Sequence, residues 1–412
     1  MKRKINSLYK QFVAGIQEKI NEINVPKDKK RIALISGKWQ VYSVVYKTLV
    51  PFINTLKDDF DLVFVNLAPN EPKQFYDFSI FKEVIDVPYT LGKIGYEELI
   101  KLDCYTSIIP DISMNDSSML ICNMRLSPIQ ISAYGHPIST FSSEMDYFIG
   151  GVEVEDVTKA QDNYQERLVL IPGIGIQVTW PTYTRRKYSL SLQNSESKII
   201  VGCIWTAQKV NYPLIEAMKK IIYSSKNKNF IFRIFPYSAP QHFTEVFIKD
   251  IRAELGNEFV EFMTVKNYDD YMCDIEDVDF VIDNFSFGGF CTVVDSFYLE
   301  KPYVAFKGPK ASGRFAPFIL EKMGVGELVT NSADEYVAKI LELIENPVKL
   351  KKMKSKFNSN QTYNLIKNLS PPEYFKKAIE DLIENHETYK AQNDKTPIII
   401  KDESKALRKK AS

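Results

Sequence analysis

The chain has 412 residues, of which 45% are hydrophobic and 25% charged, an ordinary globular composition with enough length for two domains. Its 53 basic and 52 acidic residues give no general attraction to nucleic acid, and no apolar run approaches the roughly 18 residues that a membrane-spanning helix needs. The basic start, MKRKINSLYKQF, lacks the apolar core of a secretion signal, so we expect a cytoplasmic protein.

The five cysteines form no CxxC pair and are odd in number, which favours free thiols in a reducing compartment over a disulfide framework. Only three histidines are present, and none is spaced with a cysteine pair as in a zinc site. We therefore expect neither disulfides nor a zinc ion.

Short apolar runs alternate with helical periodicity along the chain, the pattern of an α/β protein with mostly parallel sheets. The chain begins with a predicted amphipathic helix, whose apolar residues recur at every fourth position as Leu8, Phe12, Ile16 and Ile20. Strands of the first half are predicted at Arg31–Ile35, Leu62–Val65, Val84–Val87, Thr106–Ile109, Ile129–Ala133, Tyr147–Ile149 and Leu168–Ile171.

A polar stretch around Pro181, Arg185 and Arg186 separates these elements from a second α/β series, and we interpret it as a linker. The later strands are predicted at Ile199–Ile204, Phe230–Phe235, Phe259–Met263, Phe280–Ile282 and Tyr303–Phe306. Ser332 and Glu335 have the spacing of a capping box, and two prolines at 371 and 372 open a helix at Glu373–Asn385.

These patterns predict the following domain organisation. An N-terminal domain spans residues 1–180 and a linker spans 181–198. A C-terminal domain follows at 199–370, and then a C-terminal helix at 371–388. The remaining residues, 389–412, form a basic tail that we expect to be disordered, although Ile398–Ile400 is an unusual apolar run within it.

The stretch DNFSFGGFCTVVDSFYLEKP, which begins at Asp283, carries the strongest sign of a ligand site. A strand pattern stops at Asp283, a Gly288-Gly289 pair follows, and Thr292 and Asp295 begin a helical pattern. Glycines let a ligand approach the backbone, and a helix N-terminus favours phosphate. A carboxylate one turn further offers only acceptors, which suits ribose hydroxyls. An ordinary strand–turn–helix junction is the alternative for the glycines alone.

Three other polar residues follow predicted strands. Lys209 comes after the first strand of the second half, where an ammonium can neutralise a diphosphate, although a surface lysine is the simpler alternative. His136 lies in a Gly-His-Pro break beside hydroxyl side chains and suits acid–base catalysis or diphosphate binding, but a lone histidine in a turn is more often structural. Asp111 lies just past a strand and is either a general base or a cap of its loop.

Two further motifs are weak. Asp277-Val278-Asp279 has the form of a DxD metal motif, but it leads directly into a strand, which a loop-to-strand transition explains better. Gly173-Ile174-Gly175 matches only two glycines of a nucleotide-binding loop, and such matches are often false. Neither motif supports a site prediction.

Taken in order, five segments carry a family resemblance: SPIQISAYGHPIST, MDYFI, the strand before Lys209, FRIFP and FGGFCTVVDSFYLEKPYV. They resemble the bacterial cytoplasmic N-glycosyltransferases that modify adhesins and, more distantly, the catalytic region of O-linked N-acetylglucosamine transferase. The similarity extends from Thr106 to Phe357 with order and spacing kept. The resemblance implies the glycosyltransferase-B architecture, two Rossmann-like domains facing across a cleft, with the acceptor on the side of the first and a UDP-sugar held mainly by the second. It also implies inversion at the anomeric carbon without a metal ion or other cofactor.

The resemblance also implies roles for individual residues. Lys209 would contact the diphosphate, Cys291 and Thr292 would meet the phosphates at a helix N-terminus, and Asp295 would hold the ribose. His136 and Asp111 would lie near the sugar and the acceptor, as the candidate catalytic residues. The other residues assigned in this way to the nucleotide sugar, the uracil-contacting backbone at 265 and 266 included, are Phe235, Pro236, Val265, Lys266, Tyr271, Gly289 and Phe290.

The chain departs from the family at several positions. Tyr271 replaces a histidine that is common in relatives, Phe141 replaces a second histidine of the adhesin enzymes, and the segment Gly37-Lys38-Trp39-Gln40 carries no histidine. Within the 412 residues we expect no tetratricopeptide array or large helical domain of the kind that presents protein acceptors in relatives. The acceptor therefore stays open between a protein side chain and a cell-surface glycan.

The sequence thus predicts a UDP-sugar-dependent transferase of a hexose of the glucose or N-acetylglucosamine type. Its alternative is a non-catalytic partner or acceptor-binding subunit of an active glycosyltransferase, which the missing histidines favour and the retained Lys209, Thr292 and Asp295 disfavour. A UDP-sugar epimerase ranks last, because the chain is poor in acidic and histidine residues for the sugar. The expected partners are the UDP-sugar and its acceptor, without nucleic acid, and a homo-oligomer or hetero-oligomer with another glycosyltransferase stays open.

Overall fold

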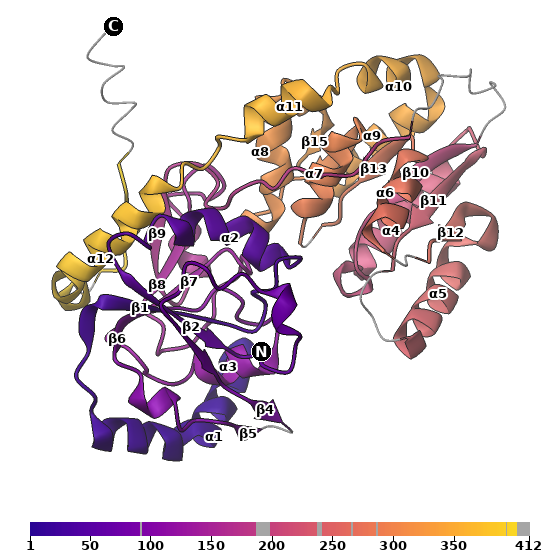
Figure 1. Cartoon of the computed structure of the whole chain (residues 1–412). Coiled ribbons are helices and arrows are strands. Elements are labelled where there is room, and N and C mark those ends of the chain that lie inside the picture. Colours follow the sequence, from indigo (N-terminus) through magenta and orange to yellow (C-terminus); the bar gives the residue numbers. More distant parts are fainter. Residues whose placement is uncertain are drawn as a thin grey trace, which may run out of the picture. The chain divides into compact units, whose positions relative to one another are not determined.

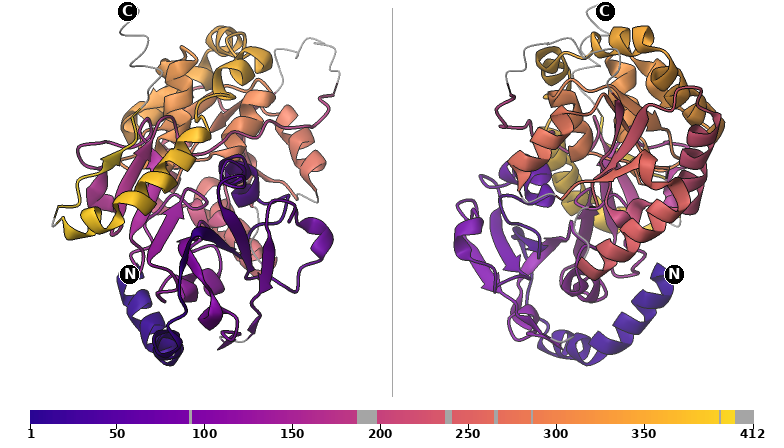
Figure 2. Two further views of the ribbon diagram at one scale, coloured as in Figure 1. Left: turned by 60° about the vertical axis from the view of Figure 1, so that its left-hand side comes forward. Right: turned by 90° about the vertical axis from the view of Figure 1, so that its right-hand side faces the viewer.

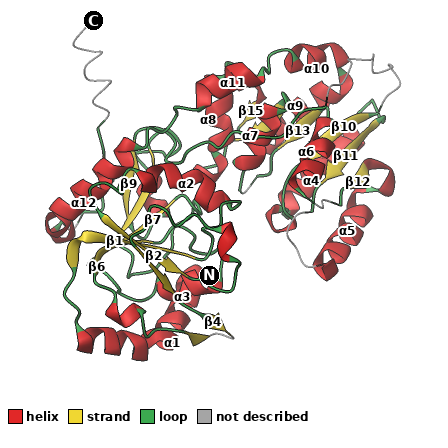
Figure 3. Ribbon diagram, viewed as in Figure 1, coloured by secondary structure: helices red, strands yellow, loops and turns green. Residues whose placement is uncertain are grey.

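The computed structural model of the chain describes residues 1–90, 93–186, 198–236, 241–264, 267–285, 287–392 and 394–401 (Figure 1). The chain divides into two compact units. Unit 1 comprises Met1–Gln177 together with Leu369–Ser412, and unit 2 comprises Val178–Asn368. Within each unit, helices surround a sheet of strands (Figure 3).

The described strands of unit 1 form a sheet in the order β16-β9-β8-β7-β6-β1-β2-β3, in which neighbouring strands run parallel. Its strands are β1 (Asp28–Ser36), β2 (Asp61–Asn66), β3 (Glu83–Asp86), β6 (Cys104–Ile108), β7 (Ile129–Ala133), β8 (Tyr147–Gly151), β9 (Arg167–Ile171) and β16 (Ile398–Ile399). A small antiparallel pair stands apart, β4 (Tyr89–Thr90) and β5 (Lys93–Ile94). The helices are α1 (Lys2–Ile23), α2 (Val44–Asn54), α3 (Asp116–Ile121) and α12 (Glu373–Ala391).

The described strands of unit 2 form a second parallel sheet, in the order β12-β11-β10-β13-β14-β15. These strands are β10 (Ile199–Cys203), β11 (Phe230–Ile234), β12 (Val260–Phe262), β13 (Phe280–Ile282), β14 (Tyr303–Phe306) and β15 (Val329–Thr330). The helices are α4 (Tyr212–Ser224), α5 (Gln241–Leu255), α6 (Tyr268–Glu276), α7 (Cys291–Tyr298), α8 (Phe315–Lys322), α9 (Ala333–Glu345), α10 (Pro347–Lys354) and α11 (Ser359–Ile366).

Each sheet has one switch point, the place where the strand order reverses. In unit 1 the chain moves outward from β1 to β3 and then returns to β6 on the other side of β1. In unit 2 it moves from β10 to β12 and returns to β13 on the other side of β10. Open parallel sheets bind ligands outside the carboxyl ends of the strands at such points. The two switch points, β1/β6 and β10/β13, are therefore where a site is expected.

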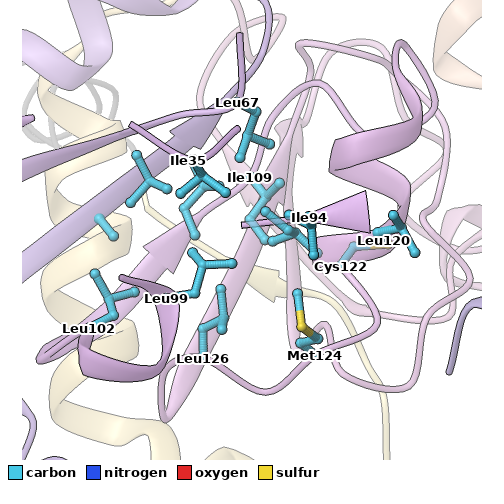
Figure 4. Packing of buried hydrophobic residues seen from close by; sticks show 14 of the residues in the cluster. Ile35, Leu67, Ile94, Leu99, Leu102, Ile109, Leu120, Cys122, Met124 and Leu126 are labelled. Carbon is cyan, nitrogen blue, oxygen red and sulfur yellow. The ribbon is translucent and has the colours of Figure 1, made fainter. Parts of the chain in front are cut away.

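Buried aliphatic side chains form the core of unit 1. The last five residues of β1 are buried, as expected of a strand covered on both faces. Ile35 of β1, Leu67 after β2 and Ile109 after β6 lie beside one another in one cluster (Figure 4). Val13 of α1 belongs to the same cluster, so this helix closes that side of the sheet.

The strands predicted from sequence are all present, but the predicted apolar face of the first helix is partly wrong. Leu8 and Phe12 of α1 are 66% and 63% exposed, and the buried line instead runs through Asn6, Val13 and Ile20. A spacing of four residues drifts around a helix by roughly 40° per step, because a turn holds 3.6 residues. A spacing of seven residues keeps to one face, so it sets the buried line.

The capping box is confirmed. Ser332 Oγ accepts a hydrogen bond of 3.1 Å from the Glu335 N–H, and Glu335 Oε2 accepts one of 2.8 Å from the Asn331 N–H. The helix predicted after the two prolines is also present as α12, but it continues to Ala391.

The C-terminal segment packs on unit 1, although it is distant from the rest of that unit in sequence (Figure 2). The Phe375 ring of α12 stacks on the Phe52 ring of α2, with centroids 5.3 Å apart and planes at 2°. Beyond α12, β16 pairs in parallel with β9. The prediction of a disordered tail is therefore wrong for β16, whose branched side chains suit an edge strand. Residues 402–412 lie outside the described part.

The described part of the predicted linker lies against unit 2. Arg186 forms ion pairs with Glu276 at 2.6 Å and with Asp277 at 3.0 Å, and Trp180 packs on Tyr298 with ring centroids 5.7 Å apart. Residues 187–197 lie outside the described residues.

Across the described ranges, no helix is both long and apolar enough to cross a membrane. The five cysteines are free thiols.

Candidate functional site

The switch point of unit 2 carries a loop from residue 283 to residue 290, which we call the glycine loop and of which Ser286 lies outside the described residues. The buried Asp283 side chain holds this loop through hydrogen bonds with its backbone. Asp283 is 1% exposed, and Oδ1 accepts hydrogen bonds from the N–H groups of Asn284 at 2.9 Å and Gly289 at 3.2 Å. The Trp205 indole N–H donates to the carbonyl of Ile282 at 2.8 Å, which anchors the end of β13. The loop is thus held by buried polar contacts.

Gly289 brings the loop against the start of α7. A Cβ at this position would lie 2.4 Å from Thr292 Oγ1, so a larger residue does not fit without a shift. The N–H groups of Val293 and Val294 both bond to the carbonyl of Phe290 at 3.1 Å, which marks the first turn of the helix. The positive end of the α7 dipole therefore faces the glycine loop.

Lys209 reaches this loop from the other side of the switch point. It ends a short 3-10 turn, Ala207–Lys209, that follows β10. Its Nζ donates to the carbonyl of Gly288 at 3.3 Å and lies 4.8 Å from the ring centroid of Phe287. Burial lowers the pKa of Lys209, and the neighbouring Asp283 and Cys291 act in the opposite direction. The structure thus brings Lys209 to the glycine loop and the α7 N-terminus, as the sequence predicted.

Lys209 and Asp283 lie close enough at this switch point to affect each other's pKa. Burial raises the pKa of Asp283 to about 6, although Lys209 and the bonded N–H groups of Asn284 and Gly289 act against the shift. The site therefore combines a partly buried ammonium, a buried carboxyl with a pKa of about 6 and a helix N-terminus. Such a combination suits an anion that carries several acceptor oxygens, as a phosphate does.

Asp295 lies one turn further along α7 and is held by two tyrosines of α6. Oδ1 accepts from the Tyr268 hydroxyl at 2.6 Å, and Oδ2 accepts from the Tyr271 hydroxyl at 3.2 Å. Asp295 is 7% exposed, whereas Tyr268 is 44% exposed and marks the solvent side of this group. The two hydroxyls thus fix the orientation of the Asp295 carboxylate.

The other predicted donor-side residues have different surroundings. The Phe235 ring is fully buried and packs edge-on against Tyr271 at 5.9 Å, so it supports Tyr271 from below. Pro236 follows it and is half-buried. Val265 and Lys266, predicted to recognise uracil through their backbone, lie outside the described residues.

In unit 1, Asp111 lies at the switch point, but its carboxylate accepts hydrogen bonds from neighbouring protein groups. It is fully buried and accepts hydrogen bonds from Ser36 Oγ at 3.1 Å, the Gly37 N–H at 2.9 Å, Asn115 Nδ2 at 3.0 Å and Ser118 Oγ at 3.0 Å. Burial raises the pKa of Asp111. These bonds tie the loop after β1 to the start of α3. Of the two roles open from sequence, the geometry favours holding the loop over accepting a proton from a substrate.

His136 lies on the next loop, after β7, and is partly exposed. A Cβ at Gly135 would lie 2.5 Å from the carbonyl oxygen of Pro110, so this loop packs tightly on the loop that carries Asp111. The hydroxyl residues that follow are structural, since Ser139 Oγ and the Thr140 N–H both donate to the buried Glu166 at 2.7 Å. His136 therefore stays the accessible acid–base candidate of unit 1.

The DxD-like segment serves the fold. Asp279 Oδ2 accepts from the Ile200 N–H at 2.8 Å and Oδ1 pairs with Lys354 at 2.5 Å, while Asp277 pairs with Arg186. Among the described residues, no group of three or more histidine, cysteine or acidic side chains is arranged to hold a metal ion.

The two glycines of the Gly-Ile-Gly segment have φ angles of 92° and 76°, so they belong to a turn that requires glycine. This turn explains the segment without a nucleotide.

Sequence reasoning missed two contributors to the site. Asp283 was seen only as the end of a strand, and Tyr268 was not considered. The available signals were an aspartate placed before a glycine pair and two tyrosines three residues apart, which share one face of a helix.

Proteins of known activity are similar to part of the chain. It is 26% identical over 241 residues to the UDP-glucose:protein N-beta-glucosyltransferase of Actinobacillus pleuropneumoniae serotype 5b, covering 58% of the chain and 38% of that protein. It is 22% identical over 258 residues to the probable UDP-N-acetylglucosamine–peptide N-acetylglucosaminyltransferase SPINDLY of Eustoma exaltatum, covering 62% of the chain and 27% of that protein. The chain thus spans less than two fifths of the length of these relatives. No family model matches it.

The fold is shared with solved glycosyltransferase structures. The O-GlcNAc transferase of Thermobaculum terrenum superposes with a TM-score of 0.69 at 14% identity, covering 93% of the chain and 74% of that protein. The HepE protein of Anabaena, solved with UDP and glucose, gives a TM-score of 0.51 at 11% identity, covering 86% of the chain and all of that protein. Both the family resemblance and the α/β glycosyltransferase-B fold predicted from sequence are thereby confirmed.

Proposed function

We propose that the chain is a glycosyltransferase that moves a hexose, of the glucose or N-acetylglucosamine type, from a UDP-sugar to an acceptor on a protein or a glycan. The observation that supports this most directly is the meeting of Lys209, the glycine loop and the α7 N-terminus at the unit 2 switch point. The relatives named above use UDP-glucose or UDP-N-acetylglucosamine.

This reaction requires stabilisation of the leaving group, which is UDP. A nucleophilic oxygen or nitrogen of the acceptor bonds to the anomeric carbon as the bond from that carbon to UDP breaks, and negative charge grows on the diphosphate. We assign the stabilisation of that charge to Lys209 and the first N–H groups of α7, which meet at the glycine loop. Asp283 holds the loop that presents them.

Asp295 is proposed to hold the ribose, because Tyr268 and Tyr271 orient its carboxylate and a carboxylate offers only acceptors, which suits ribose hydroxyls. An inverting reaction without a metal ion is proposed as well, since the positive groups named here are protein groups. For the acceptor proton we propose His136, because Asp111 is enclosed by four donors and His136 is partly exposed.

The test is a panel of UDP-sugars, with release of free UDP measured in the presence and absence of an extract of the source cells as acceptor. Release with one sugar, increased by the extract and lost in Lys209→Met, is expected. Lys220→Met is the matched control, because Lys220 lies on α4 of the same unit and pairs with the exposed Asp334.

UDP binding without release from any sugar, with or without extract, would favour the non-catalytic partner instead. If UDP release fell equally in Lys209→Met and Lys220→Met, Lys209 would have no specific role in the reaction. Binding of UDP is read separately by calorimetry, so loss of donor binding and loss of chemistry are distinguished.

A further inference from the structure

Unit 1 contains a pocket of about 440 Å³ beside its own switch point. Its wall comes from three segments that follow β1, β2 and β6 at the carboxyl edge of the sheet, together with Tyr89 of β4. Sites for small ligands have volumes of roughly 300–1,000 Å³ and occur at such edges in α/β units. None of the residues discussed so far for the donor lies in it.

The pocket is lined by three charged side chains from three different segments. Lys38 follows β1, Glu71 follows β2 and Asp116 begins α3. In the part of the chain that the structure describes, none of the three forms an ion pair or a side-chain hydrogen bond. The pocket therefore offers one strong donor and two strong acceptors to a ligand.

The pocket has a firm floor and an aromatic rim. Asn115 lies at its base, where Nδ2 bonds to Asp111 and Oδ1 accepts from the Ser118 N–H at 2.7 Å. Tyr42 and Tyr89 stand at the edge, and Tyr42 is 54% exposed. A tyrosine ring presents an apolar face together with a polar tip, which suits a ligand with both kinds of surface.

We propose that this pocket binds a saccharide, and that it is the acceptor side of the transferase. The second part rests on the proposed function. Sugar hydroxyls both donate and accept, so they match the Lys38 ammonium and the carboxylates of Glu71 and Asp116, while the C–H face of the ring packs on Tyr42. In the reaction, a hydroxyl oxygen of the bound saccharide bonds to the anomeric carbon as UDP leaves, and the hydroxyl proton passes to a protein base.

Other ligands match these residues less well. Two carboxylates against one ammonium give the pocket a net negative charge, which disfavours a phosphate or another anion. An extended peptide binds most simply to a strand edge or an apolar groove, and this pocket lies at strand ends among polar side chains. A saccharide could hydrogen-bond to all three charged side chains and pack on the Tyr42 ring.

The experiment measures binding to the full chain by saturation-transfer NMR at millimolar ligand. The probes are maltose, cellobiose, lactose and diacetylchitobiose, together with one asparagine-containing and one lysine-rich peptide. At least one saccharide is expected to bind, and Glu71→Gln combined with Asp116→Asn is expected to weaken it about tenfold or more. Tyr42→Ala is expected to weaken it several-fold.

Glu97→Gln and Tyr223→Ala are the matched controls, because both residues are exposed and lie outside the pocket. UDP affinity is measured by calorimetry for every variant and is expected to be unchanged.

Binding of a peptide but of no saccharide, lost in the pocket variants, would overturn the proposal in favour of a protein acceptor. No probe binding while UDP binds would also overturn it. If the chain does not bind UDP, the proposed function fails, and saccharide binding that depends on Glu71 and Asp116 would still support a sugar-binding pocket.

Discussion

The two switch points share a topology but use a buried aspartate differently. In unit 1, Asp111 accepts four hydrogen bonds that tie two loops together. In unit 2, Asp283 accepts two backbone N–H groups and lies beside the Lys209 ammonium and the Tyr303 hydroxyl. A buried carboxylate that accepts hydrogen bonds from four donors stabilises the fold, whereas one that lies beside a partly buried lysine forms part of a charged site.

The largest effect is expected where the carboxylate serves the fold. Asp111→Ala leaves four donors without an acceptor, so we expect the free energy of unfolding to fall by about 4 kcal/mol. Urea denaturation followed by circular dichroism measures this. Asp58→Ala, at an exposed position of unit 1, is the control. A loss as small as that of the control would mean that Asp111 is not the organiser of its loops.

The opposite outcome is expected for the lysine of unit 2. Lys209→Met keeps most of the apolar stem of this partly buried side chain, so the fold should tolerate it, while turnover falls about 100-fold or more because one stabilising donor at the diphosphate is lost. Steady-state UDP release measures turnover, and thermal unfolding checks the fold. Unchanged turnover in a folded variant would show that Lys209 does not face the leaving group.

The buried Asp283 should also make the stability of the chain depend on pH. The pKa of Asp283 is raised to about 6 in the folded chain, above its value in the unfolded chain, so the folded state holds the proton more tightly. This group therefore favours folding at low pH, and that contribution is lost as the pH rises through about 6. Between about pH 5 and about pH 7, the free energy of unfolding of the wild type should fall by about 1 kcal/mol more than that of Asp283→Asn.

Urea denaturation of both proteins at the two pH values measures this difference. The asparagine keeps an oxygen that can accept from Asn284 and Gly289, so the loop itself should persist. Parallel pH profiles of wild type and variant would mean that Asp283 does not titrate in this range.

The smallest effect is expected at the tyrosines of the donor side. Tyr268→Phe removes one of the two hydroxyls that orient Asp295, and we expect UDP to bind about fivefold more weakly, near 1 kcal/mol. Asp295→Ala removes the carboxylate itself and should abolish measurable binding. Calorimetry with UDP compares the variants, with Tyr212→Phe on the exposed face of α4 as control. Equal affinities for Tyr268→Phe and wild type would place Asp295 away from the ribose.

The unit 2 site could largely be predicted from sequence because its parts are local. Lys209 and the glycine loop each follow a strand of the same switch point, so parallel topology alone brings them together. The roles of Asp111 and Phe235 could not be predicted, because burial depends on neighbours that are far away in sequence. The pocket of Lys38, Glu71 and Asp116 was missed for the same reason, since three separate loops contribute to it.

The fold was predictable where apolar runs of four or more residues stood between polar residues or before a proline, as in β1 and β9. It was less predictable at the chain's extremes. The buried line of α1 follows a seven-residue spacing through Asn6, Val13 and Ile20, and a polar Asn6 hides that line from a hydrophobic pattern. β16 holds only Ile398 and Ile399, too short a run to distinguish from a tail without its partner β9.

The return of the C-terminal segment to unit 1 has a consequence for synthesis. Every residue of unit 2 emerges from the ribosome before Leu369, so unit 2 can finish folding first although it lies second in the sequence. Until the final residues follow, the nascent unit 1 has β9 as a bare sheet edge and Phe52 without the Phe375 ring that stacks on it. The first unit to be made is therefore the last to be completed.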